Sequence, residues 1–413
     1  MQPAIWHYQQ ITISTPQGSF TMTDYFERSL ILHEQLRGKI SVHNKLPISS
    51  REDLSLAYTP GVARPCEVIA ADPEQARKLT IKGNSVAVVS DGSAVLGLGD
   101  IGPRAALPVM EGKALLFREF AKIDAWPICL NTKDPAKIID TCRLIEPVFG
   151  GINLEDISAP RCFEIEDALQ DLGIPVFHDD QHGTAIVLLA ALINSAKVTG
   201  KKLSEMQVVI NGAGAAGSAI AKLIRGVGIP ASDIGLVGDV IICDSKGAIS
   251  SNRDDLNSSK QGMLDYTNGN DKSGGLRDVL KGADVFIGVS RGNIIGADDV
   301  RSMAKDAIIL AMANPTPEIM PEEAQKGGAA VIGTGRSDFP NQVNNVLVFP
   351  GIFRGALDAN APVINGEMKI AAAAALAGDV EEPSAEMILP HPLDRTVAPT
   401  IARKVRAAAK ASI

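Results

Sequence analysis

Short apolar runs alternate with helix-like segments through the first half of the chain. A β-rich, glycine-dense stretch begins at Ser85, and further predicted strands lie at 125–130, 148–154 and 175–177. The segments that follow carry apolar residues at helical spacing. The first of these predicted helices begins at Pro103, and the others span 135–144, 160–172 and 183–198. Strands that alternate with helices are typical of a parallel sheet, so the pattern predicts an α/β fold.

The same alternation resumes after a polar break at residues 199–206. A strand at 207–211, a small-residue helix at 213–226 and a strand at 239–243 form one predicted βαβ unit. Further predicted strands lie at 285–289, 308–313 and 330–333, and helices at 370–377 and 399–411. The polar, turn-rich stretch at 250–275 is predicted to be a surface excursion. The second half therefore predicts a Rossmann-type, doubly wound sheet.

The polar break divides the chain into two predicted domains. We expect an extension at 1–22, an α/β substrate and metal domain at 23–200, a Rossmann domain at 201–380, and a helical segment at 381–413 that packs back on the body. A length of 413 residues suits two domains. Residues 24–39 have apolar side chains at helical spacing ahead of either domain, and predict an amphipathic first helix.

Composition and charge exclude several partners. Forty basic and 48 acidic side chains give a net charge of −8, which repels nucleic acid. No apolar run approaches the length of a membrane span, and residues 1–20 lack the features of a signal peptide. The five cysteines are scattered without a Cys-x-x-Cys pair, which suits a reducing compartment. We expect a cytoplasmic protein.

The pattern G-x-G-x-x-G occurs twice, and context favours the second as a dinucleotide site. Gly212, Gly214 and Gly217 lie between a predicted strand and helix, and Asp244 ends the next strand. The first match, at 97–102, lacks such an acid. Asp244 favours NAD because a carboxylate accepts the ribose 2′-hydroxyl and repels a 2′-phosphate. Lys246 nearby could instead receive the phosphate of NADP, which stays the alternative.

Four carboxylates follow two predicted strands of the first domain. Glu155 and Asp156 come directly after one strand, and Asp179 and Asp180 after another. The carboxyl ends of parallel strands meet at one edge of the sheet, and such a charge cluster calls for a cation. Oxygen ligands suit Mg²⁺ or Mn²⁺. Helix capping by the aspartates is the competing interpretation.

Other polar residues give weaker signals on pattern alone. His178 and His182 are four apart but do not form a zinc motif, so zinc is not expected. Asn314 precedes a proline after a predicted strand and should turn outward at the sheet edge. Asn344 and Asn345 precede an apolar run, and the pattern does not decide which of them contacts a ligand. Neither Tyr58 nor Lys113 could be called catalytic from its pattern.

Taken together, the motifs resemble the malic enzyme family, in its shorter bacterial and archaeal branch. The matching stretches are LAYTPGVARPC, VVSDGSAVLGLGDIGPRAALPVMEGKALLF, INLEDI, PVFHDDQHGTA, INGAGAAG, ANPTPEI and QVNNVLVFPGIFRGAL. They lie in order between residues 24 and 380. One residue departs from the larger enzymes, since Ala94 stands where these carry an arginine that binds a malate carboxylate.

The resemblance implies roles for individual residues. Tyr58 resembles the family's general acid, Lys113 its general base, and Asp179 lies close to that lysine. The implied sets are Glu155, Asp156 and Asp180 for the divalent metal, Gly212, Gly214, Ala215, Ala216, Gly217, Asp244 and Asn314 for the coenzyme, and Lys113, Asn314 and Asn345 for the substrate.

The implied activity is oxidation and decarboxylation of L-malate to pyruvate and CO₂, with NAD(P) reduced and Mg²⁺ or Mn²⁺ required. Oxaloacetate decarboxylation is implied as well. A malolactic-type lyase and a non-catalytic dinucleotide sensor are the alternatives. No regulatory tail of the acetyl-transferase type is expected after the Rossmann domain.

The first helix bears on assembly. Tyr25, Phe26, Leu30, Ile31 and Leu36 give it an apolar face, and we expect this face to be buried against a second subunit in a homodimer. Packing on its own chain is the alternative.

Overall fold

The computed structural model describes residues 22–95, 97–229 and 236–412. For residues 22–24 it describes the backbone alone. The described residues fall into two units, divided between Val42 and His43. Most of the predicted extension at 1–22 lies outside the described residues. The division into domains at residue 200 stays a prediction.

The first unit contains the helix that the sequence predicts. Helix α1 spans Met22–Leu36 and ends before Gly38, whose φ of 114° suits a residue without a side chain. Its large apolar side chains are exposed, with Phe26 at 66% and Leu30 at 58%. This unit offers an unburied apolar face.

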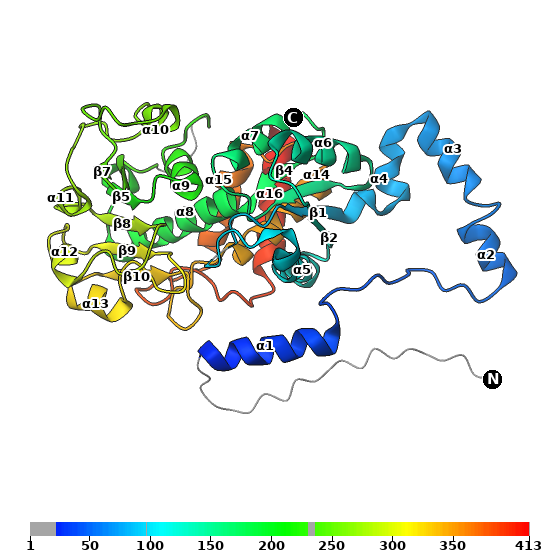
Figure 1. Cartoon of the computed structure of the whole chain (residues 1–413), viewed down its shortest axis with the longest axis horizontal. Coiled ribbons are helices and arrows are strands. Elements are labelled where there is room, and N and C mark those ends of the chain that lie inside the picture. Colours follow the sequence, from blue (N-terminus) through cyan, green and yellow to red (C-terminus); the bar gives the residue numbers. More distant parts are fainter. Residues whose placement is uncertain (1–21, 96, 230–235, 413) are drawn as a thin grey trace. The chain divides into compact units, whose positions relative to one another are not determined.

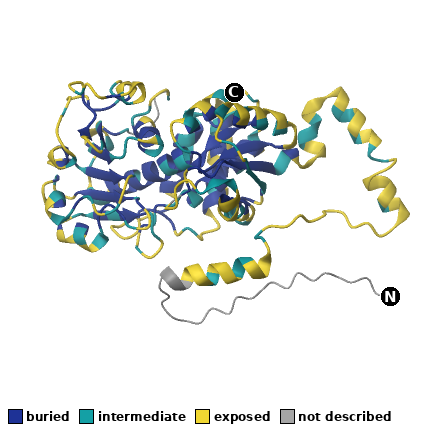
Figure 2. Cartoon of the chain, in the orientation of Figure 1, coloured by how far each residue is buried: buried dark blue, intermediate teal, exposed yellow. Residues whose placement is uncertain are grey.

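Before the first sheet, the second unit begins with helices that bury nothing. Helices α2 (Arg51–Ala57) and α3 (Ala63–Ala71) contain no buried residue, and Figure 2 shows them in the colours of exposed and intermediate residues. A short α4 (Ala76–Leu79) follows. The sequence analysis predicted none of these three helices, because none has a core-facing stripe within this chain.

The first sheet has four parallel strands in the order β2-β1-β3-β4. Figure 1 labels β1, β2 and β4 of this sheet. Their bounds are β1 (Ser85–Ser90), β2 (Asp124–Cys129), β3 (Gly151–Leu154) and β4 (Val176–His178). The connecting helices are α5 (Gly102–Ala121), α6 (Pro135–Ile145) and α7 (Arg161–Ala168). The chain leaves β1 toward β2 and returns toward β3, so the strand order reverses beside β1. Ligands bind at the carboxyl ends of strands at such a switch point.

Helix α8 (Asp179–Thr199) follows β4 and is buried on most sides. By length and composition it could cross a membrane, but 67% of its apolar window is buried in the chain. It opens with two aspartates, which are favourable near a helix N-terminus. We therefore assign it as a core helix.

The second sheet has the order β10-β9-β8-β5-β6-β7, with only β7 antiparallel among these strands. The strands are β5 (Gln207–Asn211), β6 (Asp239–Asp244), β7 (Gly247–Ala248), β8 (Val285–Gly288), β9 (Ile308–Ala311) and β10 (Val331–Thr334). Its helices are α9 (Ala215–Ile224), α10 (Ser258–Met263), α11 (Leu276–Leu280), α12 (Ala297–Arg301) and α13 (Pro321–Lys326). The unit β5-α9-β6 confirms the Rossmann fold that the sequence predicted.

Three C-terminal helices complete the core. They are α14 (Phe349–Ala359), α15 (Gly366–Gly378) and α16 (Val397–Ala411), which pack on one another and on α5 and α8. Phe353 of α14 lies edge-on to Phe117 and Phe177, with ring centroids 5.3 and 5.7 Å apart. The C-terminal helices therefore help to fix the first sheet and the elements around its strand ends.

Several predicted boundaries are wrong. Helix α8 begins at Asp179, not near Gly183, because the two aspartates take up the first turn. The strand predicted at 148–154 begins only at Gly151, after a short 3₁₀ turn. The stretch 250–275 is more than a surface excursion, since it contains α10 and buries Met263 and Asn268.

Candidate active site

The ends of β3 and β4 bring the four predicted carboxylates together. Glu155 and Asp156 directly follow β3, whereas Asp179 and Asp180 form the first turn of α8 after β4. The two strands are parallel neighbours, with Leu154 paired to His178. The register therefore places both acidic pairs at one edge of the sheet.

Lys113 reaches this edge from α5 and is buried among carboxylates. Its Nζ lies 2.6 Å from Asp179 Oδ2 and 2.7 Å from Glu155 Oε1. The ammonium also lies 4.2 Å from the ring centroid of Phe349. Burial alone would lower the pKa of Lys113, but Asp179 and Glu155 outweigh burial and hold it above its usual value. The lysine is charged in this arrangement, contrary to the lowered pKa that its expected role as a base requires.

Glu155, Asp156 and Asp180 form a potential metal site. Each offers an oxygen, and these oxygens lie within 4.8 Å of one another. The Asp156 backbone N–H donates to Asp180 Oδ2 at 2.8 Å, and Asp156 has a φ of 54°. Burial and the neighbouring acids raise the pKa of Asp156. One of its oxygens, Oδ2, is buried without a hydrogen-bond partner. An oxygen-only set with an unsatisfied buried carboxylate fits a hard divalent cation.

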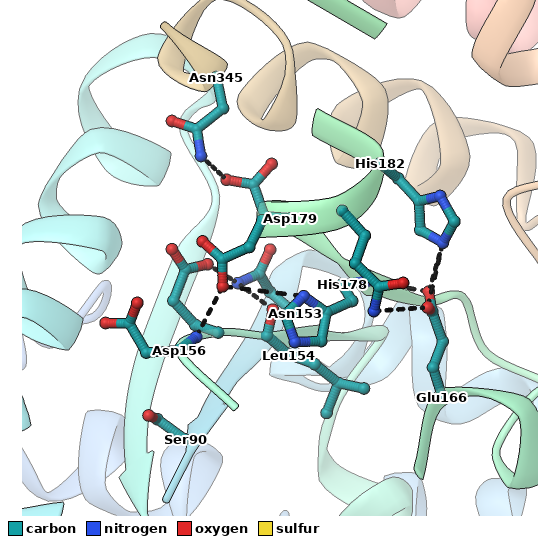
Figure 3. A network of polar contacts seen from close by, with 12 residues as sticks. Ser90, Asn153, Leu154, Asp156, Glu166, His178, Asp179, His182 and Asn345 are labelled. Atoms are coloured by element: carbon teal, nitrogen blue, oxygen red, sulfur yellow. Dashed lines mark hydrogen bonds and ion pairs between the residues drawn. The ribbon is translucent and has the colours of Figure 1, made fainter. Parts of the chain in front are cut away.

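Asn345 contacts this cluster, whereas Asn344 does not. The Asn345 side-chain amide donates to Asp179 Oδ2 at 2.6 Å, and Figure 3 shows it pointing toward that carboxylate. The Asn344 side chain instead accepts from the Val346 backbone N–H, which caps a short 3₁₀ turn. The geometry thus separates two asparagines that the sequence left equivalent.

The second glycine pattern forms the expected turn between β5 and α9. Gly212 has a φ of 135°. A Cβ on Gly217 would lie 1.8 Å from the Gly212 carbonyl oxygen, so only glycine allows this close approach. The turn leaves the first backbone N–H groups of α9 at the carboxyl end of the sheet, where a pyrophosphate can bind.

Asp244 ends β6 as predicted, but its carboxylate is not free. Arg253 donates to both of its oxygens, at 2.8 and 3.1 Å, and Lys260 Nζ lies 2.5 Å from Oδ2. These partners outweigh burial and hold the pKa of Asp244 low, at about 2. The carboxylate is therefore charged but already neutralised by two cations. This weakens the electrostatic argument that Asp244 excludes a 2′-phosphate.

Asn314 lies beyond β9, beside the first glycine pattern. Asn314 is exposed, and its backbone carbonyl oxygen is 3.7 Å from the place that a Cβ would take at Gly97. Fully buried Glu318, which the sequence analysis missed, accepts from the backbone N–H groups of Ser290 and Ala313 at 2.9 Å each. Glu318 thereby ties together the carboxyl ends of β8 and β9.

Tyr58 is the one predicted catalytic residue that the structure places on an unburied segment. It follows α2, is 67% exposed, and has no hydrogen bond from its phenol to any described residue. The backbone around Tyr58 forms a tight turn, since its N–H donates to the Leu54 carbonyl oxygen and a cis peptide follows at Thr59-Pro60. The turn does not bury the phenol within this chain.

The two histidines near the aspartates do not form a zinc site with the described acids. His182 Nε2 lies 3.0 Å from a Glu166 carboxylate oxygen, and its Nδ1 lies 3.1 Å from Lys369 Nζ. Glu166 also accepts from the His178 backbone N–H at 3.0 Å. The sequence analysis missed Glu166, whose only signal was its place on an amphipathic helix.

The two parallel sheets, with a glycine turn at one and a carboxylate and lysine cluster at the other, define an α/β protein of the nicotinamide-dinucleotide-binding class. A family model described as "Malic enzyme, N-terminal domain" matches residues 37–170, and one described as "Malic enzyme, NAD binding domain" matches residues 181–410. The chain belongs to the malic enzyme family.

Some relatives are named for NAD and others for NADP. The bifunctional malic/malolactic enzyme of Bacillus subtilis is 56% identical over 387 residues, which cover 93% of this chain and 92% of the relative. The NADP-dependent malic enzyme of Haemophilus influenzae is 46% identical over 406 residues, covering 94% of this chain and 52% of the relative. The crystal structure of the NAD-dependent malic enzyme of Thermotoga maritima superposes with a TM-score of 0.87 at 48% identity, over 92% of this chain and 98% of that chain.

Proposed function

We propose that this chain oxidises and decarboxylates L-malate to pyruvate and CO₂ in the cytoplasm, with a nicotinamide coenzyme as the oxidant. The supporting observation is the buried Lys113, held between Asp179 and Glu155 at the edge of a three-carboxylate cluster. A lysine and an oxygen-ligand cation site within one cluster suit proton removal from a 2-hydroxy acid.

Glu155, Asp156 and Asp180 would hold the divalent cation. When bound, Mg²⁺ or Mn²⁺ supplies positive charge that stabilises negative charge on the substrate oxygens. The same positive charge beside Lys113 opposes the two carboxylates that keep the lysine protonated. We infer that Lys113 becomes a usable base only in the loaded enzyme.

The residues of this chain then have distinct tasks. Lys113 accepts the proton of the C2 hydroxyl, and Asp179 holds the lysine Nζ in place at 2.6 Å. Asn345 fixes the orientation of Asp179 and presents an amide to the substrate. Tyr58 donates the proton that C3 needs after CO₂ has left.

Tyr58 requires a second copy of the chain in this proposal. Its segment contains no buried residue, and α1 of the first unit exposes a further apolar face. Two such faces in one chain suit a two-fold interface. We propose a homodimer in which Tyr58 of one copy completes the Lys113 cluster of the other.

The coenzyme would bind at the turn formed by Gly212, Gly214 and Gly217, beside Ala215 and Ala216 at the start of α9. Asn314 would lie near the nicotinamide. When bound, the nicotinamide accepts the hydride. We propose NAD as the preferred coenzyme, because Asp244 at the end of β6 keeps a charged carboxylate where a ribose hydroxyl can donate. Arg253 and Lys260 on its carboxylate reduce the penalty for NADP. Lys260→Ala is expected to raise the ratio of kcat/KM for NAD to that for NADP, and an unchanged ratio would remove Lys260 from coenzyme selection.

The direct test is malate-dependent reduction of NAD and NADP by the full chain with Mn²⁺. Equimolar pyruvate and reduced coenzyme are the expected products. Neither product would appear if the chain were only a dinucleotide sensor. Addition of EDTA should abolish turnover, and Mn²⁺ should restore it.

A malolactic reaction is a second candidate, because the Bacillus subtilis relative is named for both activities. The same lysine, carboxylates and bound coenzyme serve both reactions if the hydride returns to pyruvate before release. Lactate without net NADH would be the product. Measuring lactate and NADH in the same reaction distinguishes the two candidates.

A further inference from the structure

A cavity of about 670 Å³ is lined by residues of α7, α8, α9, α10 and α15. Its described lining includes Lys369, Lys222, Ser218 and Tyr266. Lys113, Glu155, Asp156, Asp179 and Asp180 are not among the lining residues. The cavity is therefore separate from the carboxylate cluster, although His182 of α8 lines it.

Two lysines line this cavity, and neither forms an ion pair with a carboxylate of the described residues. Lys369 Nζ has one short polar contact, 3.1 Å to His182 Nδ1. Burial, with the nearby charge of Lys222, outweighs the charge of Glu166 and lowers the pKa of Lys369. Lys222, one turn along α9 from Ser218, is exposed and forms no hydrogen bond or ion pair with a described residue. Two ammonium groups that repel each other beside a cavity are stabilised by an anion.

Hydroxyl groups add further hydrogen-bonding capacity at the same wall. Ser218 Oγ and Tyr266 OH lie 3.2 Å apart, and Ser258 and Ser259 of α10 line the cavity as well. Hydroxyls can donate to carboxylate or phosphate oxygens. The α7 wall differs, because Glu164 and Asp167 are exposed acids there. A bound anion would lie toward α9 and α15.

Glu166, the carboxylate whose charge acts on Lys369, already accepts hydrogen bonds from other residues. Glu166 accepts from His182 Nε2 and from the His178 backbone N–H (Figure 3). These partners outweigh burial and lower the pKa of Glu166 to about 2, so its charge is satisfied mainly by α8. Lys369 can therefore turn toward a ligand without leaving Glu166 unpaired.

We propose that this cavity binds a small carboxylate or phosphate anion between Lys369 and Lys222, as a site distinct from those for malate and coenzyme. Contacts connect it to the first turn of α8: Lys369 bonds to His182, His182 to Glu166, and Glu166 to the backbone just before Asp179. An anion that draws Lys369 away from His182 acts on the turn that presents Asp179 and Asp180. Occupancy should therefore change the KM for malate.

Calorimetric titration of the full chain tests the binding. Inorganic phosphate and succinate are titrated separately into protein saturated with NAD, so that the coenzyme phosphates occupy the glycine turn. The variants are Lys222→Gln and Lys369→Gln, and the matched control is Lys404→Gln, an exposed lysine on α16. Since Lys222 is exposed, its substitution should leave folding intact, and circular dichroism checks this for both variants.

We expect at least one of the two anions to bind the wild type and Lys404→Gln equally, and to bind Lys222→Gln about tenfold or more weakly. The anion that binds more tightly shows whether the cavity prefers phosphate or carboxylate. Binding of neither anion, or equal binding to all variants, would overturn the proposal. The anion that binds should also shift the KM for malate in Lys404→Gln but not in Lys222→Gln. An unchanged KM in the control would show that the cavity is not coupled to the active site.

Discussion

The Lys113 cluster and the Tyr58 segment differ in almost every physical respect, although both carry residues proposed for one reaction. Lys113, Glu155 and Asp179 are buried, and short ion pairs from α5, β3 and α8 hold them. Tyr58 lies between two helices that bury nothing. Figure 2 shows the contrast between the dark strand ends and the exposed α2 and α3.

This difference shows which half of the site a single chain can organise. The buried half is fixed by strand register and helix packing, which exclude water and keep charges at fixed distances. The exposed half has no packing to fix it, and a general acid must lie within hydrogen-bond reach of the proton's destination. A second copy is the structural element that would supply this constraint.

Removing the lysine of the buried half should have the largest effect. Lys113→Ala is expected to lower kcat for malate oxidation by about 10²- to 10⁴-fold, because the substitution removes the proposed proton acceptor for the C2 hydroxyl. NAD binding, measured by fluorescence or calorimetry, should be retained, since the Gly212 turn is untouched. Lys404→Ala is the control for loss of a lysine charge. Ordinary turnover in Lys113→Ala would disprove its role.

Removing the first helix tests the exposed half. Deletion of residues 1–40 should give a monomer and abolish activity together, although none of the proposed catalytic residues is deleted. Analytical ultracentrifugation and the malate assay on the same sample measure both outcomes. An active dimer after the deletion would show that α1 does not form the interface.

Tyr58→Phe should have a smaller and more selective effect. We expect a loss of about 10²-fold in decarboxylating turnover, with reduction of added oxaloacetate better retained, because only protonation at C3 needs the phenol. The two assays are compared on one preparation. Equal losses in both would make Tyr58 structural.

Metal should change stability modestly and in a pH-dependent way. Burial and neighbouring acids raise the pKa of Asp156 to about 9, and that of Asp179 is raised as well. Between the usual aspartate pKa of about 4 and these raised values, the metal-free native state binds more protons than the unfolded state, so its stability falls as pH rises.

In EDTA, Tm should therefore drop by a few degrees between pH 6 and pH 9, and Mn²⁺ should remove much of this drop. Differential scanning fluorimetry of the wild type and Asp156→Asn checks it. The variant should show a flatter profile in EDTA. An equal drop with and without Mn²⁺ would argue against metal at these carboxylates.

The sequence predicted the buried half better than the exposed half. Strands, the Rossmann unit and the clustering of Glu155, Asp156 and Asp180 followed from local patterns, because parallel strands end at a common edge. Contacts between distant segments could not be predicted. Examples are Arg253 and Lys260 on Asp244, and Glu166 on the turn before Asp179. The exposure of Tyr58 was also missed, because a sequence motif does not show whether its residues are buried within their own chain.

Mixing two inactive variants tests the central claim, that Lys113 and Tyr58 of different copies form one site. Lys113→Ala and Tyr58→Phe chains are purified separately, unfolded together in equal amounts and refolded. If the residues act in trans, half of the dimers are mixed and each contains one intact site, so activity should return to about a quarter of the wild-type value. If they act within one chain, each mixed dimer has two defective sites. Activity no higher than the average of the two separate variants would then contradict the account.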